Sequence, residues 1–357
     1  MLLAGYRWAM RKPRATLKDV AEAANVHIST ASRALNPETQ HTFTAEVVER
    51  VRKAARKLDY RAHAIASSLR TRRSNAIGVV IPDLLNPVFP PIILGIQETL
   101  NKEGYEITIA SVGNDAARHA AVIEGMLSRQ VDGLILATAM LKDPALTDLI
   151  SRNIAVVMVN RRDDKSRAPS VVTDDERGIA LAVEHLYSLG HRDIGHIAGP
   201  QTFSTGVTRL RGFVGAMAGK GLTVDPSRIV FADSYAREGG SRAAVQLLAH
   251  KTRPTALVAA NDLLALGCYD VLKSMGMHCP TDLSITGYND MPLVDMVSPP
   301  LTTIRIQHHQ IGTEAAKLLL RRFEEPLSPI VDVVLHAELI VRGSTTPPRS
   351  AQRKRRG

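Results

Sequence analysis

Apolar residues near the start of the chain recur at helical spacing in three short segments. The first covers residues 17–24; Thr16 can cap its N-terminus, and Asp19 complements the exposed amides of its first turn. The second covers residues 27–36 and the third residues 45–58, each with apolar side chains on one face. Two short helices joined by a tight turn and covered by a third are typical of a helix-turn-helix domain.

From about residue 77 the pattern changes to apolar strands that alternate with amphipathic helices. The expected strands lie within residues 76–83, 105–112, 121–138, 154–160, 193–200, 228–234, 256–262 and 283–290. This alternation predicts parallel sheets wound in βαβ units. Because the series starts again after a helix at about 178–189, the sequence predicts two similar α/β lobes with a cleft between them.

Polar side chains stand where three of these strands end, at Asn160, Asn261 and Asn289. Ligands of parallel sheets sit beyond the carboxyl ends of the strands, so we expect these amides to face the cleft. Arg209, at the start of a helix, can grip a carboxylate, a phosphate or a sugar diol, and Phe89 can stack on a ring. Such a site suits a sugar, a sugar acid or a similar small polar metabolite. For each asparagine taken alone, a turn-forming role is equally common.

The outward face of the second predicted helix carries an apolar side chain, hydroxyls and a guanidinium. This mixture suits the major groove of DNA, where the N-terminal residues of such a helix meet base edges. We expect Ile28 and Ser29 to read bases, Thr30 and Ser32 to contact phosphates, and Arg33 to do either. The alternative is an ordinary amphipathic helix with a solvated face.

The positive charge of the chain lies at its two ends. Residues 1–75 hold 15 Lys and Arg against 6 Asp and Glu, a net charge of +9, and residues 343–357 add +5. The segment between them, 76–342, has a net charge of −4. A basic head on an acidic body indicates a module that meets a polyanion, joined to one that does not. The alternative is a solvated arm, which is how we interpret the tail.

Composition limits the class of protein. A chain of 357 residues is long enough for two or three domains. No apolar run approaches the ~20 residues that a membrane span needs, so we expect no membrane partner. Two cysteines give no disulfide framework. The first residues lack the continuous apolar stretch and cleavage site of a secretory signal, and we expect a cytoplasmic protein.

Parallel α/β chains are often enzymes, but the motifs of enzymes are missing from this sequence. It contains no GxGxxG or P-loop phosphate cradle and no nucleophile elbow, and Cys268 sits in a helical stretch like a core residue. The acidic run 174–176 precedes a helix, where it complements the helix dipole more often than it binds a metal. We therefore expect no catalytic residues, no metal and no cofactor. A solute receptor, the other rival, would lack the basic head.

The head resembles a known family. The stretch TLKDVAEAANVHISTASRALN is similar to the signature of the lactose-repressor (LacI/GalR) family of DNA-binding transcription regulators. It departs from that signature at Asn25, His27 and Ala31, where the family often has Gly, Ser and Val. His27 replaces a hydroxyl cap, which implies either a less firmly fixed helix start or a phosphate contact. Thr16 and His27 are both candidate DNA contacts.

Residues 60–73, YRAHAIASSLRTRR, resemble the hinge segment of that family. There the hinge folds on operator DNA and pushes a leucine into the minor groove, and Leu69 matches this leucine. The family commonly has Pro-Asn where this chain has Ala62 and His63, so minor-groove contacts from His63 are a hypothesis. The alternative for Leu69 is packing against the protein core.

The body also resembles the LacI/GalR regulators and, through them, the periplasmic sugar-binding proteins. The matching stretches are NPVF, VDGLIL, VEHLYSLGHRDIGHIAGP, TRLRGF, RPTALVAANDLLALG, PTDLSITGYND and PPLTTIR. The resemblance implies that Arg209 and Asn261 contact the effector and that Phe89 packs on it.

Two pocket positions depart from the family pattern. Asn160 and Asn289 stand where aspartate is frequent or usual, which favours anionic ligands relative to an Asp-bearing site. Tyr235, beside Ser234, is close to the position of a family aromatic that stacks on the ligand. The resemblance therefore leaves the identity of the effector open.

Together these observations predict an α/β protein that joins a helix-turn-helix head and hinge helix to a two-lobed, doubly wound core. We expect an N-terminal arm at residues 1–15, the head at 16–61 and the hinge at 62–75. The effector-binding and dimerisation core follows at 76–342, and a basic disordered tail at 343–357. We expect at least a homodimer that binds double-stranded palindromic operator DNA and represses catabolic genes, although the residues do not exclude an activator. A small-molecule effector in the cleft then changes hinge order and DNA affinity.

Overall fold

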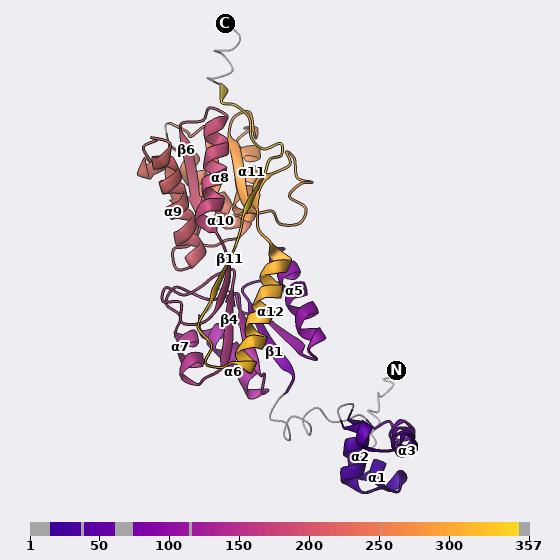
Figure 1. The fold of residues 1–357 in the computed structure, drawn as a ribbon. Helices are drawn as coiled ribbons and strands as arrows, with labels where there is room; N and C mark the ends of the chain where they lie inside the picture. The colour runs from indigo at the N-terminus through magenta and orange to yellow at the C-terminus, as the bar shows by residue number, and fades with distance from the viewer. Residues whose placement is uncertain (1–14, 37–38, 61–73, 114–115, 251, 350–357) are drawn as a thin grey trace, which may run out of the picture. The chain divides into compact units, whose positions relative to one another are not determined.

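The computed structural model of the chain describes residues 15–36, 39–60, 74–113, 116–250 and 252–349. Contacts divide the chain into two units, Met1–Ser74 and Asn75–Gly357. We describe each unit by itself, and Figure 1 traces the elements of both.

The first unit is built from three α-helices and one 3-10 turn among its described residues. They are α1 (Leu17–Ala23), α2 (Ile28–Leu35), η1 (Gln40–Thr42) and α3 (Ala45–Lys57). A capping box starts α1, since the hydroxyl of Thr16 accepts from the amide of Asp19 while the Asp19 carboxylate accepts from the amide of Thr16. Asn25 lies between α1 and α2 with a φ of 51°, the left-handed conformation that a tight turn needs. The predicted helix-turn-helix is confirmed.

Small side chains form the core of this unit. Val20, Ala24, Ala31, Ala34 and Val51 are all buried there. Alanines on α1 and α2 allow the two helix axes to approach closely, and α3 covers the pair. A core of this size leaves the outer face of α2 free of any packing role.

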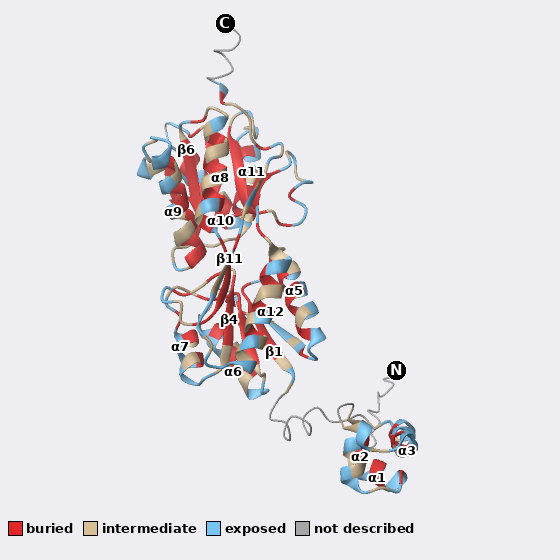
Figure 2. Cartoon of the chain, viewed as in Figure 1, coloured by how far each residue is buried: buried red, intermediate tan, exposed pale blue. Residues whose placement is uncertain are grey.

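The second unit consists of two α/β lobes. Lobe 1 begins with the elements β1 (Ala76–Ile81), α5 (Phe89–Lys102), β2 (Glu106–Ser111), α6 (Ala116–Ser128), β3 (Gly133–Leu136), α7 (Pro144–Ser151), β4 (Ala155–Val159) and β5 (Ser170–Thr173). Its strands lie in the order β11-β5-β4-β3-β1-β2, and all pairs are parallel. Figure 2 shows buried residues along the strands, between the covering helices.

Lobe 2 repeats this plan. Its elements are α8 (Asp175–Ser188), β6 (Ile194–Ala198), α9 (Ser204–Gly219), η2 (Pro226–Arg228), β7 (Ile229–Phe231), α10 (Arg237–Leu248), β8 (Ala256–Ala259), α11 (Asp262–Ser274), β9 (Ser284–Asn289), β10 (Thr302–Arg305) and the late strand β12 (Glu338–Ile340). The strand order is β12-β10-β9-β8-β6-β7, with only β12 antiparallel to its neighbour among the described pairs. The predicted two-lobed parallel core is confirmed.

The lobes are not two successive halves of the chain, which the repeated pattern alone suggested. After β10 the chain returns to lobe 1, where α12 (His308–Glu324) packs on α5 and β4 and where β11 (Asp332–Leu335) pairs with β5. It then crosses again to place β12 beside β10 in lobe 2. With the passage from β5 to α8, the two lobes are joined by three crossings.

Two glycines allow α5 and α12 to touch backbone to backbone. A Cβ atom on Gly312 would lie 2.0 Å from the carbonyl oxygen of Ile92, and one on Gly95 would lie 2.1 Å from that of His309. Both distances are far inside van der Waals contact. This helix pair therefore attaches the returning α12 to lobe 1 without intervening side chains.

The start of the basic tail differs from the expectation of disorder. Ser344 is buried; its hydroxyl donates to the carbonyl of Ile285 (2.6 Å) and accepts from the amide of Thr302 (2.8 Å). The amide of Thr346 donates to the hydroxyl of Ser284 (3.0 Å). Residues 343–349 are thus held by polar contacts with lobe 2. The prediction of disorder rested on the lack of apolar anchors, and the anchors here are polar. Residues 350–357 lie outside the described residues.

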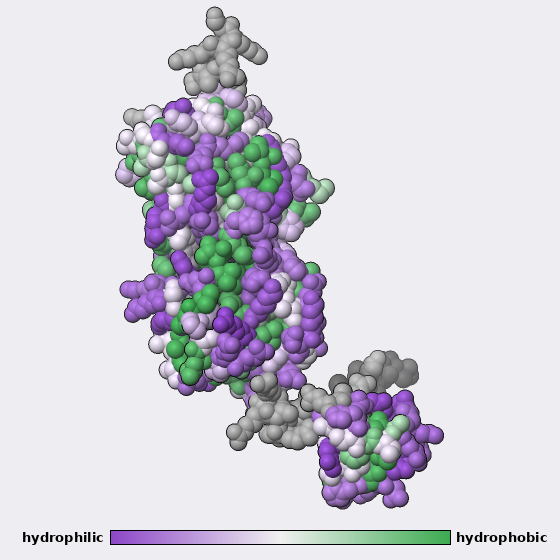
Figure 3. All heavy atoms as spheres, viewed as in Figure 1, coloured by the Kyte–Doolittle hydropathy of each residue, from purple (hydrophilic) through white to green (hydrophobic). Residues whose placement is uncertain are grey.

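The surface of the second unit carries apolar areas. Figure 3 shows them in green on the viewed face, over both lobes. Leu85, in the loop after β1, is 89% exposed, and Leu293 and Met296 are exposed on lobe 2. Among the described residues, no helix has the length and apolar character needed to cross a membrane.

Candidate functional site

The N-terminus of α2 is capped by an imidazole. The amide of Ser29 donates to Nδ1 of His27 (3.3 Å), and the hydroxyl of Ser29 lies 2.8 Å from the same nitrogen. His27 therefore caps the start of α2 in place of the hydroxyl that the family often has there. Because Nδ1 accepts, the ring proton is on Nε2, which can donate to a ligand outside the helix.

The face of α2 turned away from the core is open to solvent. His27, Ile28, Ser29 and Arg33 are exposed, and Ile28 retains 42% of its surface although it is a large apolar residue. A large apolar side chain left in water at a helix start is available for contact with a thymine methyl.

Arg33 is held in place on this face. Its Nε donates to the carbonyl of Ser29 (3.4 Å), and its guanidinium carbon lies 5.3 Å from the ring centroid of Phe43. These contacts hold the guanidinium through its Nε and against an aromatic ring. The side chain is thereby ordered before any ligand binds, which lowers the entropy cost of a bidentate contact.

One pocket between the lobes gathers the residues that the sequence indicated. Its cavity volume in this structure is about 20 Å³, well below the range for ligand sites, and it adjoins a wider cavity of about 250 Å³ that shares Phe89, Arg161 and Tyr235 with it. All six candidates line it: Phe89, Asn160, Arg209, Tyr235, Asn261 and Asn289. Four further lining residues were not predicted: Asn86, Val88, Arg161 and Thr205. The shared location follows from the parallel topology, because strand ends of both sheets meet at the cleft.

Arg209 is buried and bound on two sides. Its Nε donates to the carboxylate of Asp175 (2.9 Å), its Nη1 donates to the carbonyl of Ala260 (2.7 Å), and its guanidinium carbon lies 3.8 Å from the ring centroid of Tyr288. Burial alone would lower the pKa of Arg209, but attraction to Asp175 outweighs it and raises the pKa. Arg209 therefore stays charged and fixed in direction.

The role of Asp175 differs from the one that the sequence predicts. It belongs to the acidic run 174–176, which we had assigned to the dipole of the following helix. Asp174 does take that role, accepting from the amide of Arg177 (3.0 Å), while Asp175 turns inward to Arg209. Only the packing of α8 against α9 decides which of the adjacent acids faces inward.

The three predicted asparagines of the pocket divide into two kinds. Asn261 caps α11: its Oδ1 accepts from the amide of Leu264 (2.8 Å) and its Nδ2 donates to the carbonyl of Tyr235 (3.1 Å). Asn160 and Asn289 have φ values of 63° and 114° at the ends of their strands. Oδ1 of Asn289 is buried and has no hydrogen-bond partner, so it is an acceptor left for a ligand.

Aromatic side chains from lobe 2 form one wall of the site. Tyr235 donates from its hydroxyl to Thr205 (3.0 Å), and its ring centroid lies 6.4 Å from that of Phe203. The Tyr235 ring lies against Gly199, where a Cβ would come within 2.3 Å of it. Arg161, from the end of β4 in lobe 1, stacks over Phe203 at 3.8 Å. A stacking platform therefore exists, and a lobe 1 cation covers it.

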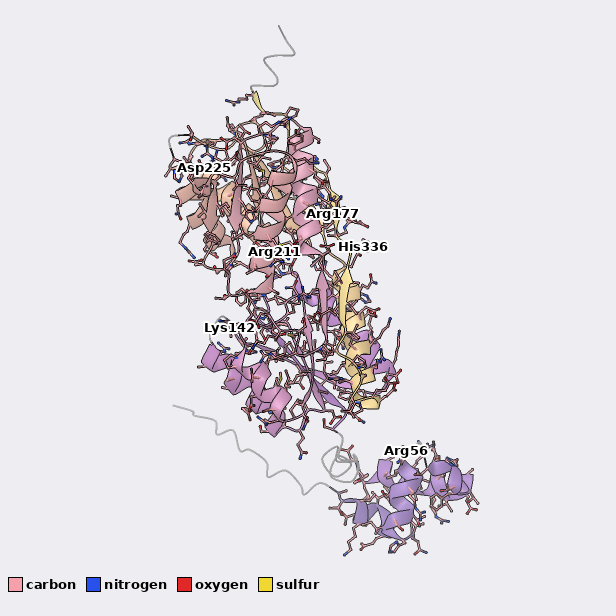
Figure 4. The ribbon with its side chains drawn as sticks, turned by 60° about the vertical axis from the view of Figure 1, so that its left-hand side comes forward. Arg56, Lys142, Arg177, Arg211, Asp225 and His336 are labelled. Carbon is pink, nitrogen blue, oxygen red and sulfur yellow. The ribbon has the colours of Figure 1, made fainter. Side chains whose placement is uncertain are left out.

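Backbone contacts also join the lobes beside the pocket. The amide of Leu141 donates to the carbonyl of Thr202 (3.1 Å), and the amide of Arg162 donates to the hydroxyl of Ser204 (3.0 Å). Figure 4 shows the side chains of the two lobes meeting at this boundary, with Lys142 labelled on lobe 1 and Arg211 on lobe 2. The lobes therefore enclose the pocket in this structure.

Two candidates cannot be placed. His63 and Leu69 of the hinge lie outside the described residues. Within the described part of the chain, no cluster of three or more His, Cys, Asp or Glu could hold a metal ion.

Comparison with known proteins assigns both units. Residues 16–63 match the family described as bacterial regulatory proteins, lacI family, and residues 183–345 match the periplasmic binding protein-like domain. The chain is 35% identical over 332 residues to the HTH-type transcriptional repressor CytR of Escherichia coli (strain K12), covering 93% of this chain and 96% of that protein. It is 31% identical over 332 residues to the HTH-type transcriptional repressor PurR of Pasteurella multocida (strain Pm70), covering 92% and 98%.

Solved structures agree with this assignment. The lac repressor dimer bound to operator and the anti-inducer ONPF has a TM-score of 0.83 and 26% identity, covering 94% of this chain and 100% of that chain. The head and the two-lobed body described above are therefore shared over nearly the whole length. The chain belongs to the LacI family of bacterial transcription regulators, and it is a DNA-binding regulator rather than an enzyme.

Proposed function

We infer that this chain represses catabolic genes by binding a palindromic operator as a homodimer, under the control of a small polar metabolite held between the lobes. The observation that carries the proposal is the combination of two features in one chain: an open, capped recognition helix and an enclosed polar pocket. A relative of known structure, the lac repressor, is a dimer on operator DNA with a small molecule bound. A protein that binds genomic DNA works in the cytoplasm of a bacterium, and we propose that location for this chain.

In this proposal α2 enters the major groove. Ile28 and Ser29 meet base edges, Thr30 and Ser32 contact phosphates, and Arg33 does either. Thr16 and His27 stand at the N-termini of α1 and α2, where helix amides and the free Nε2 of His27 favour a phosphate.

The dimer places two such helices on successive turns of the duplex. One short helix contacts too few bases for useful discrimination, and two symmetric half-sites double the contacts. The exposed apolar surface of the second unit supports self-association, since solvent-exposed patches of this kind commonly mark interaction sites. Leu69 and His63 of the hinge are proposed to contact the minor groove between the half-sites.

In the pocket, Arg209, Asn160, Asn261 and Asn289 supply hydrogen bonds to the metabolite, while Phe89 and Tyr235 contact its apolar faces. Because the pocket is lined from both lobes, a bound metabolite favours one arrangement of the lobes over another. A change in lobe arrangement then alters DNA affinity through the hinge.

Selection of genomic fragments by the purified full-length chain tests the proposal. We expect enrichment of one inverted-repeat sequence, with an affinity for it ~10³-fold or more above that for random duplex at physiological salt. Adding extracts of small metabolites should change that affinity. Equal binding to the enriched and random sequences, with and without metabolites, contradicts the proposal.

A further inference from the structure

The pocket contains a second guanidinium that the proposed function does not use. Arg161 follows β4 and is 7% exposed. Its guanidinium carbon lies 3.8 Å from the ring centroid of Phe203 and 5.7 Å from that of Tyr235. It lines the pocket together with Arg209 and also lines the wider cavity that continues from it.

Arg161 differs from Arg209 in having no counter-charge. The carboxylate of Asp175 pairs with Arg209, whereas among the described residues Arg161 forms no ion pair, and its buried Nε has no hydrogen-bond partner. Burial is the main cause that lowers the pKa of Arg161, to about 10; Tyr235 opposes this shift, and repulsion by Arg209 adds to it. The side chain is therefore still a cation at neutral pH.

Three acids that lie within two residues of a pocket residue in the sequence are engaged elsewhere. Asp163 pairs with Arg167 (2.7 Å), and Asp290 pairs with Arg342 (2.7 Å). Asp262 is held by the hydroxyl of Thr303 and the amide of Met291. Asp83 and Glu238 line the wider cavity but not the pocket itself.

The remaining polar lining of the pocket is neutral. It consists of the amides of Asn86, Asn160, Asn261 and Asn289 and the hydroxyls of Thr205 and Tyr235. Two guanidiniums and the single carboxylate that pairs with one of them leave an excess of one positive charge. An uncompensated buried charge is strongly unfavourable, so such a site is completed by a ligand of opposite charge.

We propose that the metabolite bound here carries an anionic group, a carboxylate or a phosphate, and that this group binds Arg161. The inference rests on the proposed function and narrows it: the effector is a sugar acid or sugar phosphate type of molecule, not a neutral sugar or nucleoside. Because Arg161 comes from lobe 1 and its aromatic neighbours from lobe 2, the anion also stabilises the closed arrangement of the lobes.

Pairs of probes that differ only in charge test this on the full-length protein. D-galacturonate is compared with galactose, and ribose 5-phosphate with ribose, by thermal shift and calorimetric titration at constant ionic strength. We expect at least one anionic probe to bind ~10-fold or more tightly than its neutral partner. The two pairs separate carboxylate from phosphate. Equal responses within both pairs, or no response to any probe, overturn the inference.

Variants of the pocket add a test that does not depend on the choice of ligand. Arg161→Gln should raise the melting temperature of the free protein, because it removes an uncompensated charge, and should abolish the shift produced by inorganic phosphate or acetate relative to chloride. Arg161→Lys should keep the anion response. Asn160→Asp should weaken it, because the new carboxylate neutralises Arg161.

Arg211→Gln is the matched control, since Arg211 pairs with Glu176 on the exposed surface of α9. It should leave the anion response unchanged. If Arg161→Gln and Arg211→Gln respond alike, Arg161 does not hold the anion. A neutral metabolite that changes operator binding would remove this inference but keep the proposed function. Failure to select any operator would remove the proposed function, while the anion titrations still decide the charge of the ligand.

Discussion

In both candidate sites, one side chain caps a helix and also faces a possible ligand. His27 caps α2 through Nδ1 and keeps Nε2 for a ligand, and Asn261 caps α11 while it lines the pocket. For Asn261 the sequence left a turn-forming and a ligand-binding role open; the side chain caps α11, and its place in the pocket wall leaves the second role a proposal. Neither the place of Arg161 in the pocket nor the pairing of Asp175 with Arg209 was predicted. Each residue has a neighbour of the same type, Arg162 or Asp174, and only the packed fold decides which of the two side chains turns inward.

Arg33→Ala should reduce the preference for operator over random duplex. The guanidinium is ordered by Ser29 and Phe43, so its loss removes a preformed contact worth ~1–3 kcal/mol of discrimination for each base pair read. Competition titrations with operator and random duplex measure this. Arg50→Ala is the control, because Arg50 pairs with Glu46 on α3. Unchanged selectivity in Arg33→Ala would show that Arg33 contacts phosphates only.

Arg209→Ala should abolish the effector response and also destabilise the second unit. It leaves the carboxylate of Asp175 buried and unpaired, at a cost of ~3–5 kcal/mol in the free energy of unfolding. The double variant Arg209→Ala, Asp175→Ala should recover part of that loss, because neither charge is left alone. Denaturant titrations of the two single variants and the double variant give the coupling energy. Additive losses would contradict a pairing of these groups.

Helices and strands follow the sequence pattern closely until the last sixty residues of the described chain. The alternation predicted β1 to β4 and β6 to β9, because apolar segments of strand length alternate there with amphipathic helical segments. It did not predict that α12 and β11 return to lobe 1. Which distant segments pack together depends on the shapes of their surfaces, as in the close contact of α5 with α12 at two glycines. The periodicity of apolar residues does not encode those shapes.

Gly312→Ala should separate α5 from α12 and lower the free energy of unfolding by ~1–3 kcal/mol, as overpacking does. The added methyl would lie 2.0 Å from the carbonyl oxygen of Ile92, which is backbone and cannot rotate away. Gly125→Ala on α6 is the matched control: no atom lies within 4 Å of its Cβ position, so the helix should gain ~0.5–1 kcal/mol. Thermal unfolding measures both effects as changes in melting temperature. A higher melting temperature of Gly312→Ala would refute the backbone contact between α5 and α12.

The two units carry net charges of opposite sign. The segment 1–75 has a net charge of +9 and the segment 76–342 a net charge of −4. DNA attracts the first and repels the second, which orients the regulator before any base is read. Linkage requires that operator DNA change the affinity for the metabolite by the factor by which the metabolite changes the affinity for DNA.

Leu69→Ala should lower operator affinity while the melting temperature of the second unit stays the same. The proposed minor-groove wedge acts only on DNA, so the variant loses contacts that offset base unstacking. Fluorescence anisotropy with operator, together with calorimetric unfolding without DNA, separates the two effects. A lower melting temperature with unchanged operator affinity would instead assign Leu69 to the protein core.

The three crossings between the lobes have a consequence for how this molecule can be divided. Lobe 1 takes its edge strand β11 and its covering helix α12 from the segment that follows lobe 2 in translation. A ribosome must therefore finish most of the chain before the first lobe can close. Neither lobe corresponds to a continuous gene fragment, so a premature stop codon after β10 would disable both lobes, and the first unit is the piece that a truncated gene could still deliver intact.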